Sequence, residues 1–411
     1  MTAQHPSLTG LHVAFLNWRD TGNPEGGGAE RYLEQMAAGI VERGGHATVF
    51  SAHYPGAAEV EERAGIRFVH RGSKLSVYLE GLRALRSGDL GPADVVVDVQ
   101  NGLPFFSRLV TRKPVIVLVH HVHREQWPVV YPGARGSIGW WIERSLAPRL
   151  YRRSQYVVVS RATLEELRSL GVRGPRVAVV RNGTEMVAPS GRQKTAHPSI
   201  CVVGRLVPHK QVEHAIDATM RLREELPGLR LTVVGTGWWE QDLHRYAAER
   251  DARDAVMFTG HVDEERKRQI YEESWVMALP SLKEGWGLVV GEAGVAGTPT
   301  VAFRSAGGTR ESIVHGHSGL LANDDEQFVE HLRSVLVDPG LRTALSQGAH
   351  EVSGRFSWEQ ARASFAHVLR RVHAGERVVA EDEENDGEDE IRKGELAPQT
   401  PGPAATGRSR S

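Results

Sequence analysis

The chain has 411 residues, of which 40% are hydrophobic and 25% are charged, and its formal net charge is −1. This composition is typical of a folded globular protein, and the length exceeds what one hydrophobic core usually serves, so we expect two domains of similar size. Residues 375–411 carry ten acidic and five basic side chains, so the preceding chain has a net charge of +4, which is too small to indicate nucleic-acid binding.

The amino terminus and the single cysteine bear on the location of the protein. The first ten residues lack a basic region followed by an apolar run, and no stretch of about 18 uncharged apolar residues occurs, so we predict neither a signal peptide nor a transmembrane helix. Cys201 lies in an apolar run, where a buried structural thiol is favoured over a catalytic one. These features favour a cytoplasmic protein.

In the first half of the chain, short valine-rich runs alternate with amphipathic segments. The runs are apolar throughout, as strands buried on both faces should be. Between the first two of them, Glu30–Arg43 has apolar residues at helical spacing, so strand, helix and strand predict a parallel, doubly wound sheet. The expected strands are Val13–Leu16, Ala47–Ser51, Ile66–His70, Val95–Asp98, Val115–Val119, Tyr156–Val159 and Val177–Val180.

A second alternating series follows residues 188–198, which contain two prolines, a glycine and polar residues and are predicted to be an interdomain linker. Helices such as Glu213–Glu224 and Glu264–Glu273 separate its strands. We therefore expect an α/β protein whose two Rossmann-like doubly wound domains, residues 1–187 and 199–356, face a ligand cleft. The strands expected in the second domain are Ile200–Val203, Leu231–Val234, Val256–Phe258, Trp275–Leu279, Thr300–Phe303 and Leu320–Leu321.

The carboxyl-terminal part differs from both series. Residues 357–374 are predicted to form a helix that packs back toward the first domain, with Ser357 as N-cap and Gln360 in the capping-box position. Residues 375–411 contain an acidic run and a Pro/Gly-rich end, which bury too little apolar surface to fold, so we expect a disordered tail.

Two motifs place glycines or cations directly after expected strands. In 26-GGGAE-30, Gly27 and Gly28 let the backbone approach a ligand, and the following helix presents N–H groups to an anion; a plain tight turn is an equal interpretation. In 204-GRLVPHK-210, Gly204 precedes Arg205 and Lys210, two cations that suit a diphosphate. The alternative for these cations is an exposed position at a helix start.

The motif 284-EGWGLVVGE-292 follows the strand that ends at Leu279. Gly285 and Gly287 allow a curled loop, which would hold Glu284, whereas Glu292 would lie in the next helix. Carboxylates accept hydrogen bonds from paired sugar hydroxyls, so one glutamate could bind a transferred sugar and the other a ribose. Taken alone, the motif slightly favours two glutamates that are simply stabilised by the helix dipole.

Three histidines occur in 120-HHVH-123. This spacing in a loop rarely directs three imidazoles at one ion, and no HExxH pattern completes a site, so we predict no metal ion. A better use is a single histidine that donates to a sugar hydroxyl from the end of a strand.

In this order, the four motifs resemble glycosyltransferase family 4, a GT-B family of retaining enzymes, over residues 11–373. Further matching pieces are 17-NWRD-20, Asn182-Gly183, 307-GGTRES-312 and 319-GLL-321. The resemblance implies a glycosyltransferase that moves a sugar from a nucleotide-diphosphate sugar to a hydroxyl acceptor with retention, and that needs no metal ion or other cofactor. The leaving phosphate would help deprotonate the acceptor, so no enzyme nucleophile is needed.

The same resemblance implies a role for each matching residue. Arg205 and Lys210 would bind the diphosphate and offset the charge that develops as the glycosidic bond breaks. Glu284 would bind the transferred sugar, Glu292 the ribose and Val262 the base. The implied catalytic residues are His120, Arg205, Lys210 and Glu284. The implied donor-binding residues are Gly27, Gly28, Gly204, Arg205, Lys210, Val262, Glu284, Gly285, Gly287, Leu288, Val289 and Glu292.

The first domain is expected to bind the acceptor, which would be a glycan, a lipid or a small molecule. Its segment 126–153 combines tryptophans, tyrosines and arginines. A core-packing helix with a basic outer face is the favoured interpretation, and the alternative is peripheral docking on the inner face of a membrane to reach a lipid-linked acceptor.

Two other functions compete with glycosyl transfer. One is a GT-B nucleotide-sugar epimerase, against which the arrangement of Glu284 and Glu292 argues. The other is a non-catalytic sugar-nucleotide-binding protein, against which the joint presence of His120, Arg205 and Lys210 argues.

Overall fold

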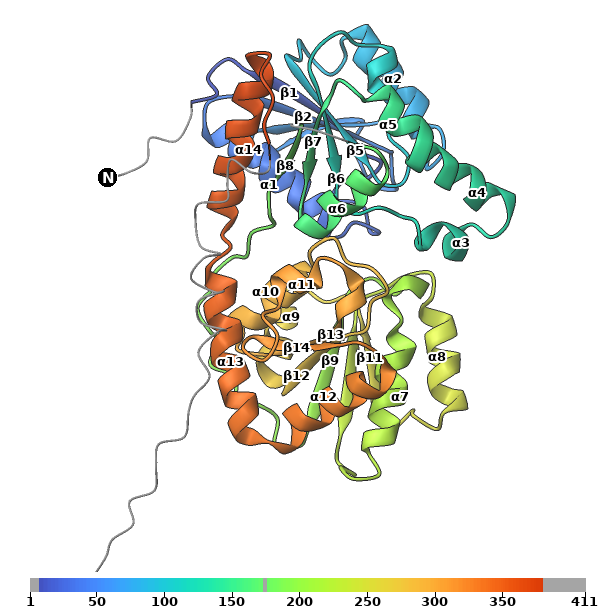
Figure 1. Cartoon of the computed structure of the whole chain (residues 1–411), viewed down its shortest axis with the longest axis vertical. Coiled ribbons are helices and arrows are strands. Elements are labelled where there is room, and N and C mark those ends of the chain that lie inside the picture. Colours follow the sequence, from blue (N-terminus) through green and yellow to red (C-terminus); the bar gives the residue numbers. More distant parts are fainter. Residues whose placement is uncertain (1–6, 173–175, 380–411) are drawn as a thin grey trace, which may run out of the picture.

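The computed structural model describes residues 7–172 and 176–379, which form two α/β domains lying one above the other (Figure 1). The described part of the first domain contains an eight-stranded sheet in the order β3-β4-β2-β1-β5-β6-β7-β8, and only the β3–β4 pair is antiparallel. Its strands are β1 (His12–Leu16), β2 (His46–Ser51), β3 (Val60–Arg63), β4 (Ile66–His70), β5 (Val95–Gln100), β6 (Val115–Val119), β7 (Gln155–Val158) and β8 (Val177–Val179).

Helices cover both faces of this sheet, as the apolar character of its strands requires. Along β1, Val13 and Phe15 pack on the face of α1 and α14, whereas Ala14 and Leu16 pack on the face of α2, α5 and α6. The helical elements of this half are α1 (Gly28–Glu42), α2 (Val77–Ser87), η1 (Ser107–Leu109), α3 (Gln126–Val130), α4 (Ala134–Trp141), the π-helix η2 (Ile142–Leu146), α5 (Ala147–Leu150), α6 (Arg161–Ser169) and, from the end of the chain, α14 (Trp358–His373).

The second domain has a parallel sheet in the order β11-β10-β9-β12-β13-β14. One face packs on α7, α8 and α12, and the other on α9 and α10. Its strands are β9 (Ser199–Val203), β10 (Arg230–Val234), β11 (Val256–Gly260), β12 (Val276–Leu279), β13 (Thr300–Phe303) and β14 (Gly319–Ala322). Its helical elements are η3 (Pro208–Lys210), α7 (Val212–Leu222), α8 (Glu240–Glu249), α9 (Glu264–Glu273), α10 (Leu288–Val295), η4 (Arg304–Ala306), α11 (Thr309–Ser312), α12 (Asp325–Val337) and α13 (Pro339–Gly354).

Two helices near the end of the chain connect the domains along one side (Figure 1). Helix α13 packs on α10 of the second domain, and α14 returns to pack on α1 of the first. The predicted capping box is confirmed, because Gln360 N donates to Ser357 Oγ at 3.2 Å and Ser357 N donates to Gln360 Oε1 at 3.1 Å.

The first residues of the segment expected to be disordered pack against the first domain. Val378 is buried in the first core, and its backbone exchanges two hydrogen bonds of 3.0 Å with the side chain of Gln155. The prediction treated residues 375–411 as one polar segment and overlooked this apolar anchor. The acidic run and the Pro/Gly-rich end, from residue 380, lie outside the described residues.

The parallel strands agree with the predicted runs to within two residues at each end, and Cys201 is fully buried as expected. Burial raises the pKa of its thiol to about 11. Strand β3 was missed because its sequence, VEER, is mostly charged, which is typical of a short sheet edge. Within the described residues, no helix is both long and apolar enough to span a membrane.

Candidate functional site

The strand order reverses between β1 and β5 in the first sheet and between β9 and β12 in the second. Ligands of doubly wound sheets bind beyond the carboxyl ends of the strands at such reversals. Three of the four motifs lie in segments that come directly after these strands: residues 17–28 follow β1, residues 204–210 follow β9, and residues 280–288 follow β12. The fourth contributes His120, directly after β6, so the topology brings all four motifs toward the interdomain surface.

A cation and a carboxylate meet in the second domain. Lys210, at the end of η3, places its Nζ 2.5 Å from Glu284 Oε1. Both side chains are largely buried, and a small hollow of about 10 Å³ beside Lys210 is lined in part by Gly204, Arg205 and Ser281. A larger depression of about 570 Å³ lies between α7 and α12, but it is lined mainly by surface charges and by no residue of these motifs. The smaller hollow is therefore the candidate site.

Glycines allow the two domains to approach closely around this site. A Cβ atom on Gly27 would lie 3.4 Å from Arg205 Nε, and one on Gly28 would lie 3.0 Å from Leu288 Cδ1. A Cβ atom on Gly285 would lie 2.4 Å from the carbonyl oxygen of His120, which no side chain tolerates. The structure thus brings motif residues of both domains together.

Gly287 is the N-cap of α10, and its φ of +87° is a conformation that favours glycine. It directs the first turn of the helix, which begins with Leu288 and Val289 and whose N–H groups have no partners within the helix. Val289 and Val262, the residue predicted to contact the base, both pack on the apolar cluster beneath α9 and α10.

His120 is buried, and its Nε2 has no hydrogen-bond partner among the described residues. Its carbonyl oxygen accepts a hydrogen bond of 3.0 Å from Thr163 Oγ1, which fixes the backbone. Burial lowers the pKa of His120 to about 4, so the imidazole is neutral at pH 7. A neutral ring with a free Nε2 can exchange a hydrogen bond with a ligand hydroxyl.

The neighbouring histidines have other partners. His121 Nε2 lies 3.2 Å from Gln126 Oε1, and His123 Nδ1 lies 3.2 Å from Glu143 Oε1. Glu143 is fully buried and also accepts a hydrogen bond of 2.6 Å from Trp127 Nε1. The histidines therefore tie the loop to α3 and η2 and are not directed at one point.

Glu292, predicted to bind a ribose, has different surroundings from Glu284. Its Oε1 accepts a hydrogen bond of 2.9 Å from Arg31 Nη1, which reaches across from α1. Its Oε2 lies 3.2 Å from Lys267 Nζ and accepts a hydrogen bond of 3.2 Å from Tyr271 Oη. Sequence reasoning missed Arg31 because it looks like any cation on the polar face of a helix until the domains are packed.

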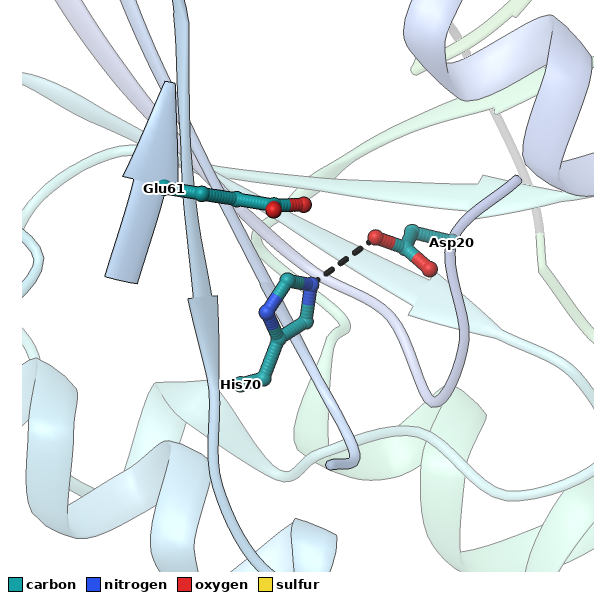
Figure 2. Close-up of side chains that lie close together, drawn as sticks. All are labelled: Asp20, Glu61 and His70. Atoms are coloured by element: carbon teal, nitrogen blue, oxygen red, sulfur yellow. Dashed lines mark hydrogen bonds and ion pairs between the residues drawn. The ribbon is translucent and has the colours of Figure 1, made fainter. Parts of the chain in front are cut away.

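One group of potential metal ligands occurs in the described residues, away from the histidine motif. Figure 2 shows Asp20, Glu61 and His70, whose ligand atoms lie within 4.8 Å of one another. Asp20 Oδ2 lies 2.9 Å from His70 Nε2 and accepts a hydrogen bond of 2.6 Å from Arg63 Nη2, while Arg63 Nε lies 3.2 Å from Glu61 Oε1. The guanidinium of Arg63 contacts both carboxylates and offsets part of their charge.

Two family models match the chain. The model for Glycosyltransferase Family 4 matches residues 26–187, and the model for Glycosyl transferases group 1 matches residues 188–352. The two matches adjoin and together cover most of the chain. The chain belongs to glycosyltransferase family 4. It is a glycosyltransferase with the GT-B fold.

Sequence relatives of this glycosyltransferase include a glycogen synthase and several D-inositol 3-phosphate glycosyltransferases. A glycogen synthase of Mycobacterium tuberculosis is 28% identical over 279 residues, which span 64% of this chain and 67% of the relative. A D-inositol 3-phosphate glycosyltransferase of Streptomyces bingchenggensis is 31% identical over 185 residues, which span 42% of this chain and 40% of the relative.

Solved structures resemble this glycosyltransferase over most of its length. Sucrose-phosphate synthase from Thermosynechococcus elongatus superposes with a TM-score of 0.77 at 19% identity, over 89% of this chain and 100% of the other. HepE from Anabaena, in complex with UDP-glucose, superposes with a TM-score of 0.69 at 19% identity, over 88% and 99%. At these identities the likeness establishes the fold alone.

Proposed function

We propose that this glycosyltransferase moves a sugar from a nucleotide-diphosphate sugar to a hydroxyl acceptor, with retention of the anomeric configuration and without a metal ion or other cofactor. The observation that carries the proposal is the contact of Lys210 with Glu284 beside Arg205, at the surface where the domains meet. Two cations suit the diphosphate, and the carboxylate suits sugar hydroxyls. HepE, a structural neighbour, binds UDP-glucose, which supports a nucleotide-sugar donor.

In the proposed reaction, Arg205 and Lys210 stabilise the negative charge that grows on the leaving diphosphate. The departing phosphate oxygen takes the proton of the acceptor hydroxyl on the same face of the sugar. Neutral His120, with its unpaired Nε2, binds a sugar hydroxyl near the reacting carbon. Because these cations supply the positive charge that a metal ion would otherwise supply, no metal ion is required.

A thermal-shift screen with UDP, GDP, ADP and their common sugar conjugates, each with and without EDTA, tests the donor and the metal independence. We expect one nucleotide series to raise the melting temperature equally in both conditions, because binding to the folded state alone stabilises it. A shift that EDTA abolishes would contradict metal independence. No shift with any compound would favour a role other than sugar transfer.

The same donor then separates the competing reactions. Transfer releases the nucleoside diphosphate and leaves an α- or β-linked product whose configuration NMR reports, and retention is expected. An epimerase would instead return an isomeric nucleotide sugar without releasing the diphosphate.

We also propose that the protein works in the cytoplasm at the inner membrane face, which the segment 124–153 would contact. Trp140 packs on the core of the first domain, but Trp141 and Ile138 are 51% and 58% exposed. The two acidic residues of the segment, Glu125 and Glu143, are half-buried and buried. Exposed apolar side chains among arginines suit an anionic bilayer. The exposed arginines are Arg124, Arg135, Arg144, Arg149, Arg152 and Arg153.

We expect the protein to co-sediment at low salt with vesicles of equal parts phosphatidylcholine and phosphatidylglycerol, and not with phosphatidylcholine alone. Replacing Ile138 and Trp141 together by serine should reduce binding severalfold, because both side chains would lose their apolar contact with the bilayer. Leu79→Ser, on exposed α2, is the matched control. No binding of the unaltered protein to the anionic vesicles would rule out membrane contact.

A further inference from the structure

Arg19 is a buried cation at the interdomain surface whose hydrogen-bonding capacity is only partly used. It follows β1 at the point where the strand order reverses, and only 5% of its surface is exposed. Its Nη1 donates to Glu25 Oε2 at 3.1 Å. Its Nε is 3.6 Å from Glu30 Oε1 and makes no hydrogen bond within the described chain. Buried guanidinium groups normally use all their donors, so this one is short of a partner.

A second guanidinium approaches from the other domain. Arg205 Nε would lie 3.4 Å from a Cβ atom on Gly27, and Gly27 N donates to Glu30 Oε2 at 2.8 Å. Arg19 therefore lies beside Glu30, and Arg205 beside Gly27, which is hydrogen-bonded to Glu30. Burial lowers the pKa of Arg19, Glu30 opposes this effect, and the positive charge of Arg205 lowers the pKa further.

Bringing two cations together in a largely buried place costs free energy unless an anion compensates them. The buried carboxylate of Glu30 supplies one negative charge. Lys210 adds a third cation on the side of Arg205, although Glu284 is paired with it. An incoming anion with several oxygen atoms would be shared by these groups, and the unpaired Nε of Arg19 would be one of its donors.

We propose that Arg19 is a phosphate-binding residue. It adds a cation from the first domain to the site that Arg205 and Lys210 form in the second domain. The proposal rests on the proposed function, and its ligand chemistry is a phosphate oxyanion. That phosphate belongs either to the donor diphosphate or to a phosphorylated acceptor, since the first domain faces both.

The structure also shows how Arg19 is held in place before a ligand arrives. Its Cζ lies 3.8 Å from the ring centroid of Trp18, so the guanidinium stacks on the indole. Asn17 Nδ2 donates to the carbonyl oxygen of Arg19 at 2.7 Å, which fixes the backbone. A guanidinium that is positioned in advance loses little conformational freedom on binding phosphate.

Isothermal titration of the full-length protein tests this role. The variants are Arg19→Gln and Arg19→Lys, with Arg83→Gln on the exposed face of α2 as control. The probes are UDP, GDP and ADP, the three corresponding nucleosides, and inorganic phosphate. If the donor diphosphate is the ligand, Arg19→Gln should weaken nucleoside diphosphate binding about 10- to 100-fold and leave nucleoside binding unchanged. Arg19→Lys should restore part of the loss.

If a phosphorylated acceptor is the ligand, the affinity for the nucleoside diphosphate should stay unchanged. Arg19→Gln should then abolish the binding of inorganic phosphate to the nucleotide-saturated protein. Equal loss of nucleoside and diphosphate affinity would show a purely structural role and overturn the proposal, as would unchanged binding of every probe. If the unaltered protein binds no nucleotide, the proposed function fails, while the phosphate titration still decides the role of Arg19.

Discussion

Replacing Lys210 by alanine is expected to lower turnover about 10²–10³-fold, because the variant loses a charge that stabilises the leaving diphosphate. Lys210 Nζ contacts Glu284 Oε1 at 2.5 Å, and the lysine side chain is 21% exposed. Removing the lysine leaves the largely buried carboxylate of Glu284 without its ion-pair partner, so the free energy of unfolding should fall by about 3 kcal/mol. Release of nucleoside diphosphate from the donor found by thermal shift measures the rate, and circular dichroism checks the fold.

Arg221→Ala is the matched control for Lys210→Ala. Arg221 lies in the same domain and forms an exposed ion pair with Glu326, at 2.8 Å, on the surface of α7 and α12. Its loss should leave turnover within about twofold, because an exposed pair contributes little and lies away from the strand ends. A Lys210→Ala variant that is as active as this control would show that the diphosphate is bound elsewhere.

Replacing Glu284 by alanine should reduce turnover by a similar factor, about 10²–10³-fold, since a preorganised contact to the reacting sugar is lost. The backbone of Glu284 is held independently of its side chain, because its N–H donates to Ala306 O at 2.7 Å and its carbonyl accepts from Gly308 N at 3.0 Å. The loop should therefore keep its course in the variant. Glu284→Gln keeps the shape of the side chain but not its charge. Its turnover should lie between that of the unaltered protein and that of Glu284→Ala.

Glu225→Ala, which removes the exposed ion pair of Glu225 with Arg333, is the control for Glu284→Ala.

A double variant of Lys210 and Glu284 tests whether the two side chains act on the same ligand. Since the two side chains contact each other and act on one ligand, the double variant should lose less activity than the product of the two single losses. Strictly multiplicative losses, or single variants of normal activity, would contradict a shared site.

Most elements could be predicted because their signals are local. Val95–Asp98 and Val115–Val119 are apolar on both faces, and Glu264–Glu273 was predicted with the bounds that α9 has. Where the local signal was misleading, the prediction failed. The charged edge strand β3 has no apolar pattern of its own and forms by pairing with β4. Val378 lies in a mostly polar segment and is fixed by Gln155, 223 positions away.

The residues of the candidate site could likewise be predicted only in part. Gly27, Gly204 and Gly287 could be proposed from sequence because glycines and charges that follow strands lie at the carboxyl ends of a parallel sheet. The sequence contains only a weak sign of a role for Arg19, since 17-NWRD-20 is no more than a further piece that matches the family. Arg31 carried none, because a cation on a helix surface does not show which carboxylate it will meet.

The sequence by itself determined the two sheets, the helices between them and the strand ends at which the motifs stand, because hydrophobic periodicity and glycine positions act over a few residues. Only the tertiary structure decided which groups meet. The packing of the two domains places Gly27 against Arg205 and joins Arg31 to Glu292, 261 positions apart. Such contacts depend on the relative position of two separately formed cores, which no local pattern encodes.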